Sequence, residues 1–477
     1  MFCRTTRREF LKMLGWGAVA IAHPVAISSC KREKPLNILV LFTDDQRFDT
    51  IQALGNQDIH TPHLDKMVHK GTSFKNSYIM GGTSGAVCMP SRAMLLTGRG
   101  LFHIEETGGA IPEDHTMMPE LFRKHGYRTF GIGKWHNGRE AFARCFSDGA
   151  EIMFGGMSDH WNVPAYDFDP AGDYARGHDH ITEGKHSSEL FADAAVDFLE
   201  NHKSPDPFFL YVSFTAPHDP RTAPKEFLDM YDPEKIPLPL NFLPNHPFDN
   251  GEMNIRDELL ADFPRTSKEV RKHIAEYYAM ISHMDAQIGH IIETLHRTGK
   301  EENTLIVFTC DNGLALGQHG LLGKQSVYEH SVHVPLVLCG PGIPQGELRD
   351  NFCYLTDMFC SVCELAGIPK PDSVGGESLV PVIRNQTKKG REALYFSYKH
   401  YQRALRTKRW KLILYNVRGK KHTQLFDMEN DPWEMNNLAE DPSQADRIRQ
   451  MTEMLKSMMA DAGDPVRLDE PDWGGTG

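Results

Sequence analysis

The sequence predicts an α/β protein with a large, mostly parallel central sheet between layers of helices and a smaller antiparallel sheet toward the C-terminus. Three observations support this fold class. Four long apolar runs end in polar residues, two long segments repeat apolar residues at helical spacing, and residues 393–428 alternate apolar and polar side chains. With 477 residues, of which 40% are hydrophobic and 24% charged, the chain is long enough for one large domain and a smaller one.

The four apolar runs are predicted to be central strands. They are rich in Val, Ile, Leu and Phe without polar alternation, as expected of strands buried on both faces of a parallel sheet, and cover residues 36–42, 128–133, 208–214 and 304–309. Each run leads directly into polar residues. Ligands of such sheets bind beyond the carboxyl ends of the strands, so the sequence predicts one shared site there.

The intervening segments are predicted to supply helices for both faces of this sheet. Residues 187–202 and 268–299 repeat apolar side chains at helical spacing, and the second segment stops at a glycine. After about residue 370 the pattern changes to short alternating runs with turn signals, followed by a helix-like tail at 441–463. We therefore expect a large α/β domain at 36–370 and a C-terminal α+β subdomain at 371–477.

The first 30 residues are predicted to be an export leader. Arg7 and Arg8 precede an apolar stretch that is too short and too interrupted to span a bilayer. This arrangement of an arginine pair and an apolar stretch resembles a twin-arginine export signal. Residues 27–30 resemble a lipobox, so Cys30 is an expected lipid anchor. The prediction is an exported bacterial protein, either periplasmic or a membrane-anchored lipoprotein. A formal net charge of -12 argues against nucleic acid as a partner.

The stretch AVCMPSRAMLLTGR, residues 86–99, places a cysteine at a predicted helix N-terminus. Pro90 suits the first helical turn and Gly98 the position after the last, so Cys88 is expected where free N–H groups and the positive dipole end concentrate. An anion bound there would be stabilised. Arg92, one turn further, can place its guanidinium against that anion or against the nucleophile.

This stretch resembles the active-site signature of the type I sulfatases, members of the alkaline phosphatase superfamily. The resemblance is carried by Cys88, Pro90, Arg92, Thr97, Gly98 and Arg99. It implies an alkaline-phosphatase-like fold. It also implies that a separate maturation enzyme oxidises Cys88 to formylglycine. The hydrate of that aldehyde is the family's nucleophile, so the thiol is expected to be a precursor.

The other strand ends match the family pattern as well. The resemblance implies a metal site formed by Asp44, Asp45, Cys88, Asp311 and Asn312. Oxygen donors without thiolate or histidine favour a hard cation, so Ca²⁺ is expected first and Mg²⁺ second. The motifs GKWH at 133–136 and PHDP at 217–220 also match. A further block at 316–342 places Lys324 at the position of a sulfate-binding lysine. His319 in this block is expected either to line the pocket as a substrate-binding residue or to be a structural histidine behind it.

A sulfate monoester needs cationic groups around its oxygens while the bond to the leaving alcohol breaks. Lys134 and Lys324 can supply them. The hydrated aldehyde at residue 88 is the expected nucleophile, and His218 is the expected general acid for the departing oxygen. His136 is expected to remove a proton from the second hydroxyl of the hydrate, which expels sulfate.

The leading hypothesis is a sulfuric ester hydrolase that acts on a sulfated carbohydrate. One alternative is a phosphonate or phosphate ester hydrolase of the same superfamily. A second alternative, of a different class, is a non-catalytic binder of sulfated glycans with an unmodified Cys88. A two-zinc phosphatase is disfavoured because the strand ends lack the histidines of such sites.

Overall fold

The central sheet has eight strands in the order β5-β4-β6-β1-β7-β8-β2-β9. Only β8 runs antiparallel to its neighbours. The computed structural model describes residues 34–175 and 177–474. The strands are β1 (Asn37–Thr43), β2 (Gly71–Tyr78), β4 (Arg128–Lys134), β5 (Asp148–Met153), β6 (Phe208–Ser213), β7 (Thr304–Cys310), β8 (Leu336–Cys339) and β9 (Glu347–Tyr354). The expected mostly parallel sheet is confirmed.

Alternate residues of the central strands enter two separate hydrophobic cores, as the period of two requires. Leu39 and Leu41 of β1 pack with the helices on one face of the sheet. Ile38 and Val40 of the same strand pack with the helices on the other face. Because both faces are covered, β1, β6 and β7 are buried almost throughout, which explains their uninterrupted apolar sequences.

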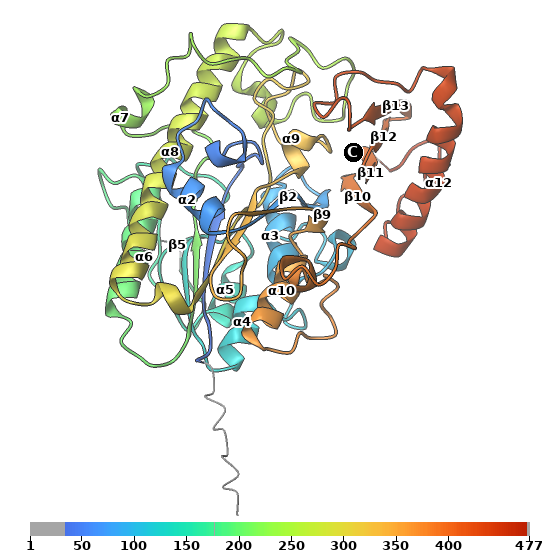
Figure 1. The fold of residues 1–477 in the computed structure, drawn as a ribbon. Coiled ribbons are helices and arrows are strands. Elements are labelled where there is room, and N and C mark those ends of the chain that lie inside the picture. Colours follow the sequence, from blue (N-terminus) through green and yellow to red (C-terminus); the bar gives the residue numbers. More distant parts are fainter. Residues whose placement is uncertain (1–33, 176, 475–477) are drawn as a thin grey trace, which may run out of the picture. The chain divides into compact units, whose positions relative to one another are not determined.

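Helices α2, α6 and α8 cover one face of the sheet, and α3, α4, α5 and α10 cover the other (Figure 1). The predicted helices at 187–202 and 268–299 correspond to α6 and α8. The α-helices are α2 (Pro62–Lys70), α3 (Cys88–Thr97), α4 (Met118–Lys124), α5 (Arg139–Cys145), α6 (Ser187–Asn201), α7 (Lys225–Leu228), α8 (Ser267–Arg297), α9 (Glu329–Val332), α10 (Asp357–Ala366), α11 (Val380–Ile383) and α12 (Ala445–Ala462). Short 3₁₀ turns are η1 (Gln52–Leu54), η2 (Leu101–His103), η3 (Arg256–Leu260), η4 (Glu301–Asn303) and η5 (Pro442–Gln444).

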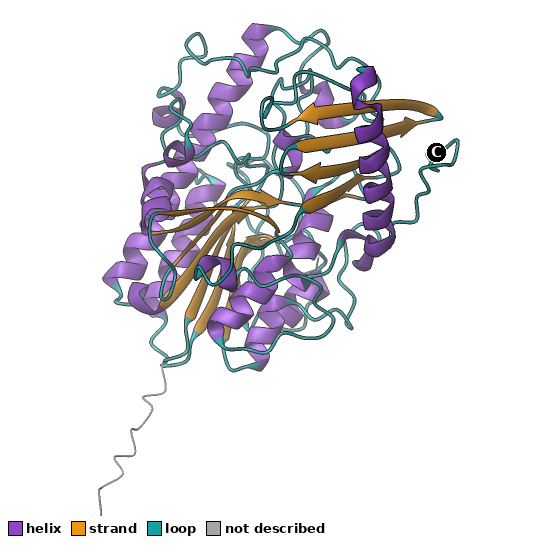
Figure 2. Ribbon diagram, turned by 45° about the vertical axis from the view of Figure 1, so that its right-hand side comes forward, coloured by secondary structure: helices purple, strands orange, loops and turns teal. Residues whose placement is uncertain are grey.

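A second sheet has the strand order β13-β12-β11-β10-β3 and is antiparallel except for its β10–β3 edge. Its strands are β3 (Gly81–Gly82), β10 (Ala393–Tyr398), β11 (Gln402–Thr407), β12 (Trp410–Val417) and β13 (Lys420–Asp427). Helix α12 packs across this sheet (Figure 2) and buries Leu455 and Met459. Since β3 comes from the segment just before α3, the second sheet reaches the loop that leads to Cys88.

Both sheets belong to one compact unit that starts at Pro35. The expected leader at residues 1–30 lies outside the described part of the chain. None of the helices in residues 34–175 and 177–474 has the length and apolarity of a membrane span.

Candidate active site

Four adjacent strands of the central sheet, β4, β6, β1 and β7, end at the same edge. Their carboxyl ends carry polar side chains from four distant parts of the sequence. Asp44 and Asp45 follow β1, while Lys134 is the last residue of β4. His218 lies in the loop after β6, and Asp311 and Asn312 follow β7. The order of the strands therefore brings these predicted site residues together.

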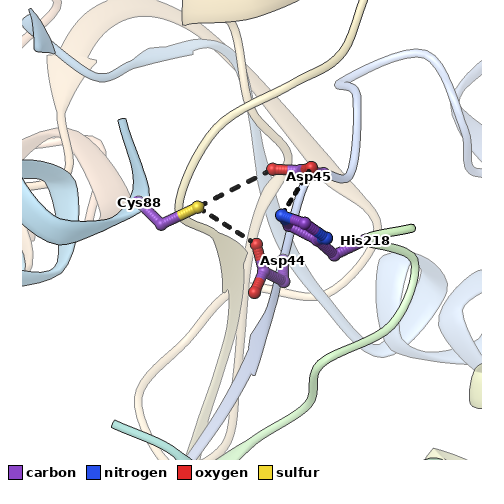
Figure 3. Close-up of side chains that lie close together, drawn as sticks. All are labelled: Asp44, Asp45, Cys88 and His218. Atoms are coloured by element: carbon purple, nitrogen blue, oxygen red, sulfur yellow. Dashed lines mark hydrogen bonds and ion pairs between the residues drawn. The ribbon is translucent and has the colours of Figure 1, made fainter. Parts of the chain in front are cut away.

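Cys88 is the first residue of α3, as predicted, and its side chain points at the end of β1. Its Sγ lies 3.3 Å from Asp44 Oδ1 and 3.9 Å from Asp45 Oδ1. Figure 3 shows Cys88, Asp44, Asp45 and His218 converging, and one ligand atom from each lies within 4.8 Å of the others. Helix α3 ends at Gly98 in the left-handed conformation, with φ 63°, also as predicted.

Arg92 ties the strand ends together from within the protein. Its Nε lies 2.9 Å from Asp311 Oδ2, and its Nη2 lies 3.4 Å from Asp44 Oδ2. Its Nη1 donates to the carbonyl oxygen of Lys134 at 3.0 Å and to Ser213 Oγ at 2.7 Å. The guanidinium is fully buried and contacts the ends of all four strands, so it holds the carboxylates in place.

Two buried lysines face the carboxylates. Lys134 pairs with Asp44, and Lys324 Nζ lies 2.6 Å from Asp45 Oδ1 and 3.0 Å from Cys88 Sγ. Burial alone would raise the pKa of Asp44, but Lys134 and other nearby cationic groups hold it well below its ordinary value. Burial raises the pKa of Asp45 to about 6 in spite of Lys324.

Two histidines complete the site. His218 Nδ1 lies 2.8 Å from the carbonyl oxygen of Asp219, which can only accept, so Nε2 is left facing Asp45 Oδ2 at 3.7 Å. Burial, with Lys324, lowers the pKa of His218 to about 4. Burial, with Lys134, lowers the pKa of His136 to about 2, so this imidazole is neutral at neutral pH.

The residues at the cluster fit a divalent cation that prefers oxygen ligands. Asn312 donates its Nδ2 to Asp45 Oδ1 at 2.7 Å, while its buried Oδ1 has no hydrogen-bond partner. An unpartnered amide oxygen beside the carboxylates of Asp44 and Asp45 is a hard donor set. Both carboxylate oxygens of Asp311 already have partners within the protein. Its Oδ1 accepts from the backbone N–H of Asp45 at 3.1 Å, and its Oδ2 pairs with Arg92.

The thiol of Cys88 is a weak nucleophile in this setting. Burial, with Asp311 and Asp44 nearby, raises its pKa well above the ordinary value. A thiol in this state stays protonated at neutral pH, and the thiolate is the reactive form of cysteine.

His319 is the one predicted pocket residue that the structure does not bring into the cluster. Its ring is stacked on Tyr328 with 4.0 Å between centroids, and its Nε2 lies 3.0 Å from Asn241 Nδ2. These contacts hold the segment before Lys324.

Residues without a sequence signal also shape the site. Ser213 anchors Arg92, and Gly156 approaches the ring of His136 so closely that a Cβ there would lie 2.5 Å from Nε2. Asp219, by contrast, could have been found from the sequence, because it lies in the PHDP motif directly after His218, the predicted general acid.

Comparisons with known proteins agree over nearly the whole chain. The family described as Sulfatase matches residues 36–368, and N-sulphoglucosamine sulphohydrolase, C-terminal, matches residues 317–461. An arylsulfatase of Clostridium perfringens is 30% identical over 461 residues, which cover 88% of this chain and 93% of the relative. An N-acetylglucosamine-6-O-sulfatase of Bacteroides thetaiotaomicron is 26% identical, covering 91% of this chain and 88% of the relative.

A solved structure in complex with its substrate D-glucosamine-2-N,6-O-disulfate has the same fold. It aligns with a TM-score of 0.75 at 24% identity and covers 91% of this chain and 99% of its own. The family match spans the strand ends that carry Asp44, Cys88, Lys134, His218 and Asp311. With this match and a relative at 30% identity, the chain belongs to the sulfatase family of the alkaline phosphatase superfamily, and it is a sulfatase, a hydrolase of sulfate esters.

Proposed function

We propose that this sulfatase removes sulfate from a sulfated carbohydrate, with formylglycine at residue 88 as nucleophile and Ca²⁺ as cofactor. The observation that carries the proposal is the position of Cys88 Sγ, 3.3 Å from Asp44 Oδ1 and 3.0 Å from Lys324 Nζ at the tip of α3. The carbohydrate class is supported by the N-acetylglucosamine-6-O-sulfatase among its relatives and by the sulfated glucosamine bound to the similar structure.

The proposed modification converts the Cys88 side chain to an aldehyde through a separate maturation enzyme. The Sγ in the structure then stands in for the hydroxyl oxygens of the hydrated aldehyde. A hydrate has two hydroxyls on one carbon. One of them can attack sulfur and the other can later release the product, which the single hydroxyl of a serine could not do.

Asp44, Asp45, Asp311 and Asn312, together with residue 88, would hold the metal. Bound there, a divalent cation acidifies a hydroxyl and offsets negative charge on the sulfate. Ca²⁺ is proposed because carboxylate and amide oxygens dominate the site and Asn312 Oδ1 is free to ligate.

In the first step a hydroxyl of residue 88 gives up its proton to solvent and attacks sulfur in line, and the bond from sulfur to the substrate oxygen breaks. Lys134 and Lys324 neutralise the sulfate oxygens during this step. His218 donates the proton that the departing alcohol needs. Its pKa of about 4 in the substrate-free site favours the neutral ring, and the charge of a bound sulfate ester opposes that lowering.

In the second step His136 removes the proton of the remaining hydroxyl. The carbon–oxygen bond to the sulfate breaks, the aldehyde is restored, and water hydrates it again. The pKa of about 2 in the substrate-free site leaves His136 unprotonated, and the negative charge of the bound sulfate ester opposes that lowering, which strengthens the base.

We also propose that the enzyme is exported from a bacterial cell. Support comes from the Arg7-Arg8 pair and from Cys30 in the leader-like segment. Replacing both arginines with lysine should retain the protein in the cytoplasm, and Cys30→Ala should move it from the membrane to the soluble fraction. Unchanged fractionation in both variants would contradict export by this route.

Four measurements test the function. Mass spectrometry of the peptide around residue 88 from the native host should find the aldehyde, whereas an unaltered thiol would favour a glycan binder. Paired aryl sulfate and aryl phosphonate esters should show faster hydrolysis of the sulfate. A large preference for the phosphonate would instead favour the phosphonate or phosphate ester hydrolase of the same superfamily.

After chelation, Ca²⁺ should restore activity and the unfolding temperature better than Mg²⁺. A panel of defined sulfated sugars would identify the substrate.

A further inference from the structure

The 3₁₀ turn η3 lies outside every motif of the sequence analysis, yet it contacts the loops that carry two of the proposed active-site residues. Its first residue, Arg256, binds Asp219 with both ends of the guanidinium, at 2.5 Å to Oδ2 and 2.9 Å to Oδ1. The backbone oxygen of the same Asp219 fixes His218 Nδ1 at 2.8 Å. Arg256 therefore holds the residue that orients the His218 ring.

The next two residues of the turn hold the loop of Lys324. Asp257 Oδ2 accepts from Gln325 Nε2 at 2.7 Å, and Gln325 Oε1 accepts from the backbone N–H of Lys324 at 2.9 Å. Glu258 accepts from the backbone N–H groups of Leu322 and Gly323 at 2.9 and 2.8 Å. The two carboxylates thus fix the backbone on both sides of Lys324.

Close packing between the turn and these loops is a second, independent observation. A Cβ at Gly323 would lie 2.9 Å from Asp257 Cβ, and a Cβ at Gly85 would lie 2.8 Å from Ile255 Cδ1. Gln325 Nε2 also donates to the carbonyl oxygen of Gly85 at 3.0 Å. The turn and its partner Gln325 therefore also contact the loop that leads to Cys88.

We propose that η3 is a positioning element. Arg256 orients the general acid His218, and Asp257 and Glu258 hold the loop that carries the sulfate-binding Lys324. The inference rests on the roles proposed above for His218 and Lys324. Neither residue lies on a helix or strand, so the sheet that places Asp44 and Asp311 does not place them. Charged hydrogen bonds from three consecutive residues supply that constraint, and Asp257 and Glu258 are buried while they do so.

The proposal predicts separable defects at the two ends of the turn. In Arg256→Lys the bidentate contact to Asp219 is lost, so proton donation by His218 is impaired. We expect kcat/KM to fall about 10-fold for aryl sulfates with weakly acidic phenols and less than about 2-fold for activated ones, since acid catalysis matters most for poor leaving groups. Glu258→Gln should instead weaken inhibition by free sulfate about 10-fold, with equal loss across all leaving groups.

A matched control is available in the second sheet. Arg403 also binds an aspartate with two hydrogen bonds, from Nε to Asp464 Oδ2 at 2.5 Å and from Nη2 to Asp464 Oδ1 at 2.9 Å, and it is buried, whereas Arg256 is partly exposed. Arg403→Lys should lower the unfolding temperature and leave both the leaving-group dependence and sulfate inhibition unchanged. If Arg256→Lys behaves like this control, the turn is only structural and the inference is overturned. Rates are compared per mole of aldehyde at residue 88, so that incomplete maturation does not enter.

Parallel variants separate this inference from the proposed function. His218→Ala should steepen the leaving-group dependence, and Lys324→Ala should weaken sulfate inhibition about 10- to 100-fold. If these parent variants fail to do so, the proposed roles are wrong. If they do so while Arg256→Lys and Glu258→Gln have no such effect, the positioning role is wrong. Should Arg256→Lys not fold, Asp219→Asn, which removes the charge from the same contact, replaces it. Should Glu258→Gln not fold, Asp257→Asn replaces it. This variant keeps the shape of the side chain and is expected to weaken sulfate inhibition through Gln325, and unchanged inhibition would count against the proposal.

Discussion

Gly156→Ala should slow the second half of the reaction and leave the first half intact. A Cβ at this position would lie 2.5 Å from His136 Nε2 and 2.6 Å from Cε1. Non-bonded heavy atoms need about 3.5 Å, so the imidazole must retreat by about 1 Å. A misplacement of that size costs about 100-fold in the rate of the step that uses the group. If His136 is the base that releases sulfate, kcat should fall by about this factor.

Rapid-mixing experiments with an aryl sulfate distinguish the two steps. The variant should release a burst of phenol stoichiometric with the enzyme at the wild-type rate, followed by slow turnover. Gly155→Ala is the matched control, because a Cβ there would lie 3.5 Å from Met153 Cε and 3.7 Å from the oxygen of Met157, which are ordinary contacts. Loss of the burst itself would refute the assignment of His136 to the second step. A normal kcat would refute the claim that Gly156 positions the ring.

Further predictions concern the nucleophile, the sulfate site and the response to pH. Cys88→Ala should abolish turnover without changing the circular dichroism spectrum, and near-normal rates would exclude residue 88 as nucleophile. Lys134→Ala and Lys324→Ala should each weaken inhibition by inorganic sulfate about 10- to 100-fold, the effect of losing one charged hydrogen bond, and unaltered inhibition constants would remove them from the sulfate site. Burial, with His160 nearby, lowers the pKa of His283 to about 4, whereas the unfolded side chain titrates near pH 6.5. The unfolded chain therefore binds the extra proton, and the stability present above about pH 6.5 is lost as pH falls toward about 4. His283→Gln should flatten the slope of the unfolding free energy against pH in this window, as measured by urea titration, and an unchanged slope would contradict this assignment.

The fold class was predictable because its signals are local. Continuous apolar runs mark β1, β4, β6 and β7, since strands covered by helices on both faces have no solvent-facing residues. The helical spacing of α8 and the glycine that ends α3 are local features as well. The order of the strands in the sheet could not be predicted in this way, because strand pairing joins residues far apart in sequence and no local pattern indicates it.

Several residues of the site illustrate the same division. Asp44, Cys88, Lys134 and His218 could be named in advance because each begins, ends or follows a predicted element within a recognisable motif. Sequence left open whether His319 lines the pocket or has a structural role, and in the structure its backbone is left-handed, with φ 53°, and its ring is stacked on Tyr328. A backbone turn decided where that side chain lies.

The side chains proposed to bind a cation, hold a sulfate or move a proton could be named from local patterns in the sequence, together with the strands that carry them. Only the tertiary structure decided how these groups are held. Arg92 joins four strand ends, and η3 binds the loops of His218 and Lys324. Such contacts depend on distances between segments that are remote in the chain. They arise when the folded core fixes those distances. The sequence signature contains Arg92 but does not indicate which groups its guanidinium contacts, and no motif marks η3.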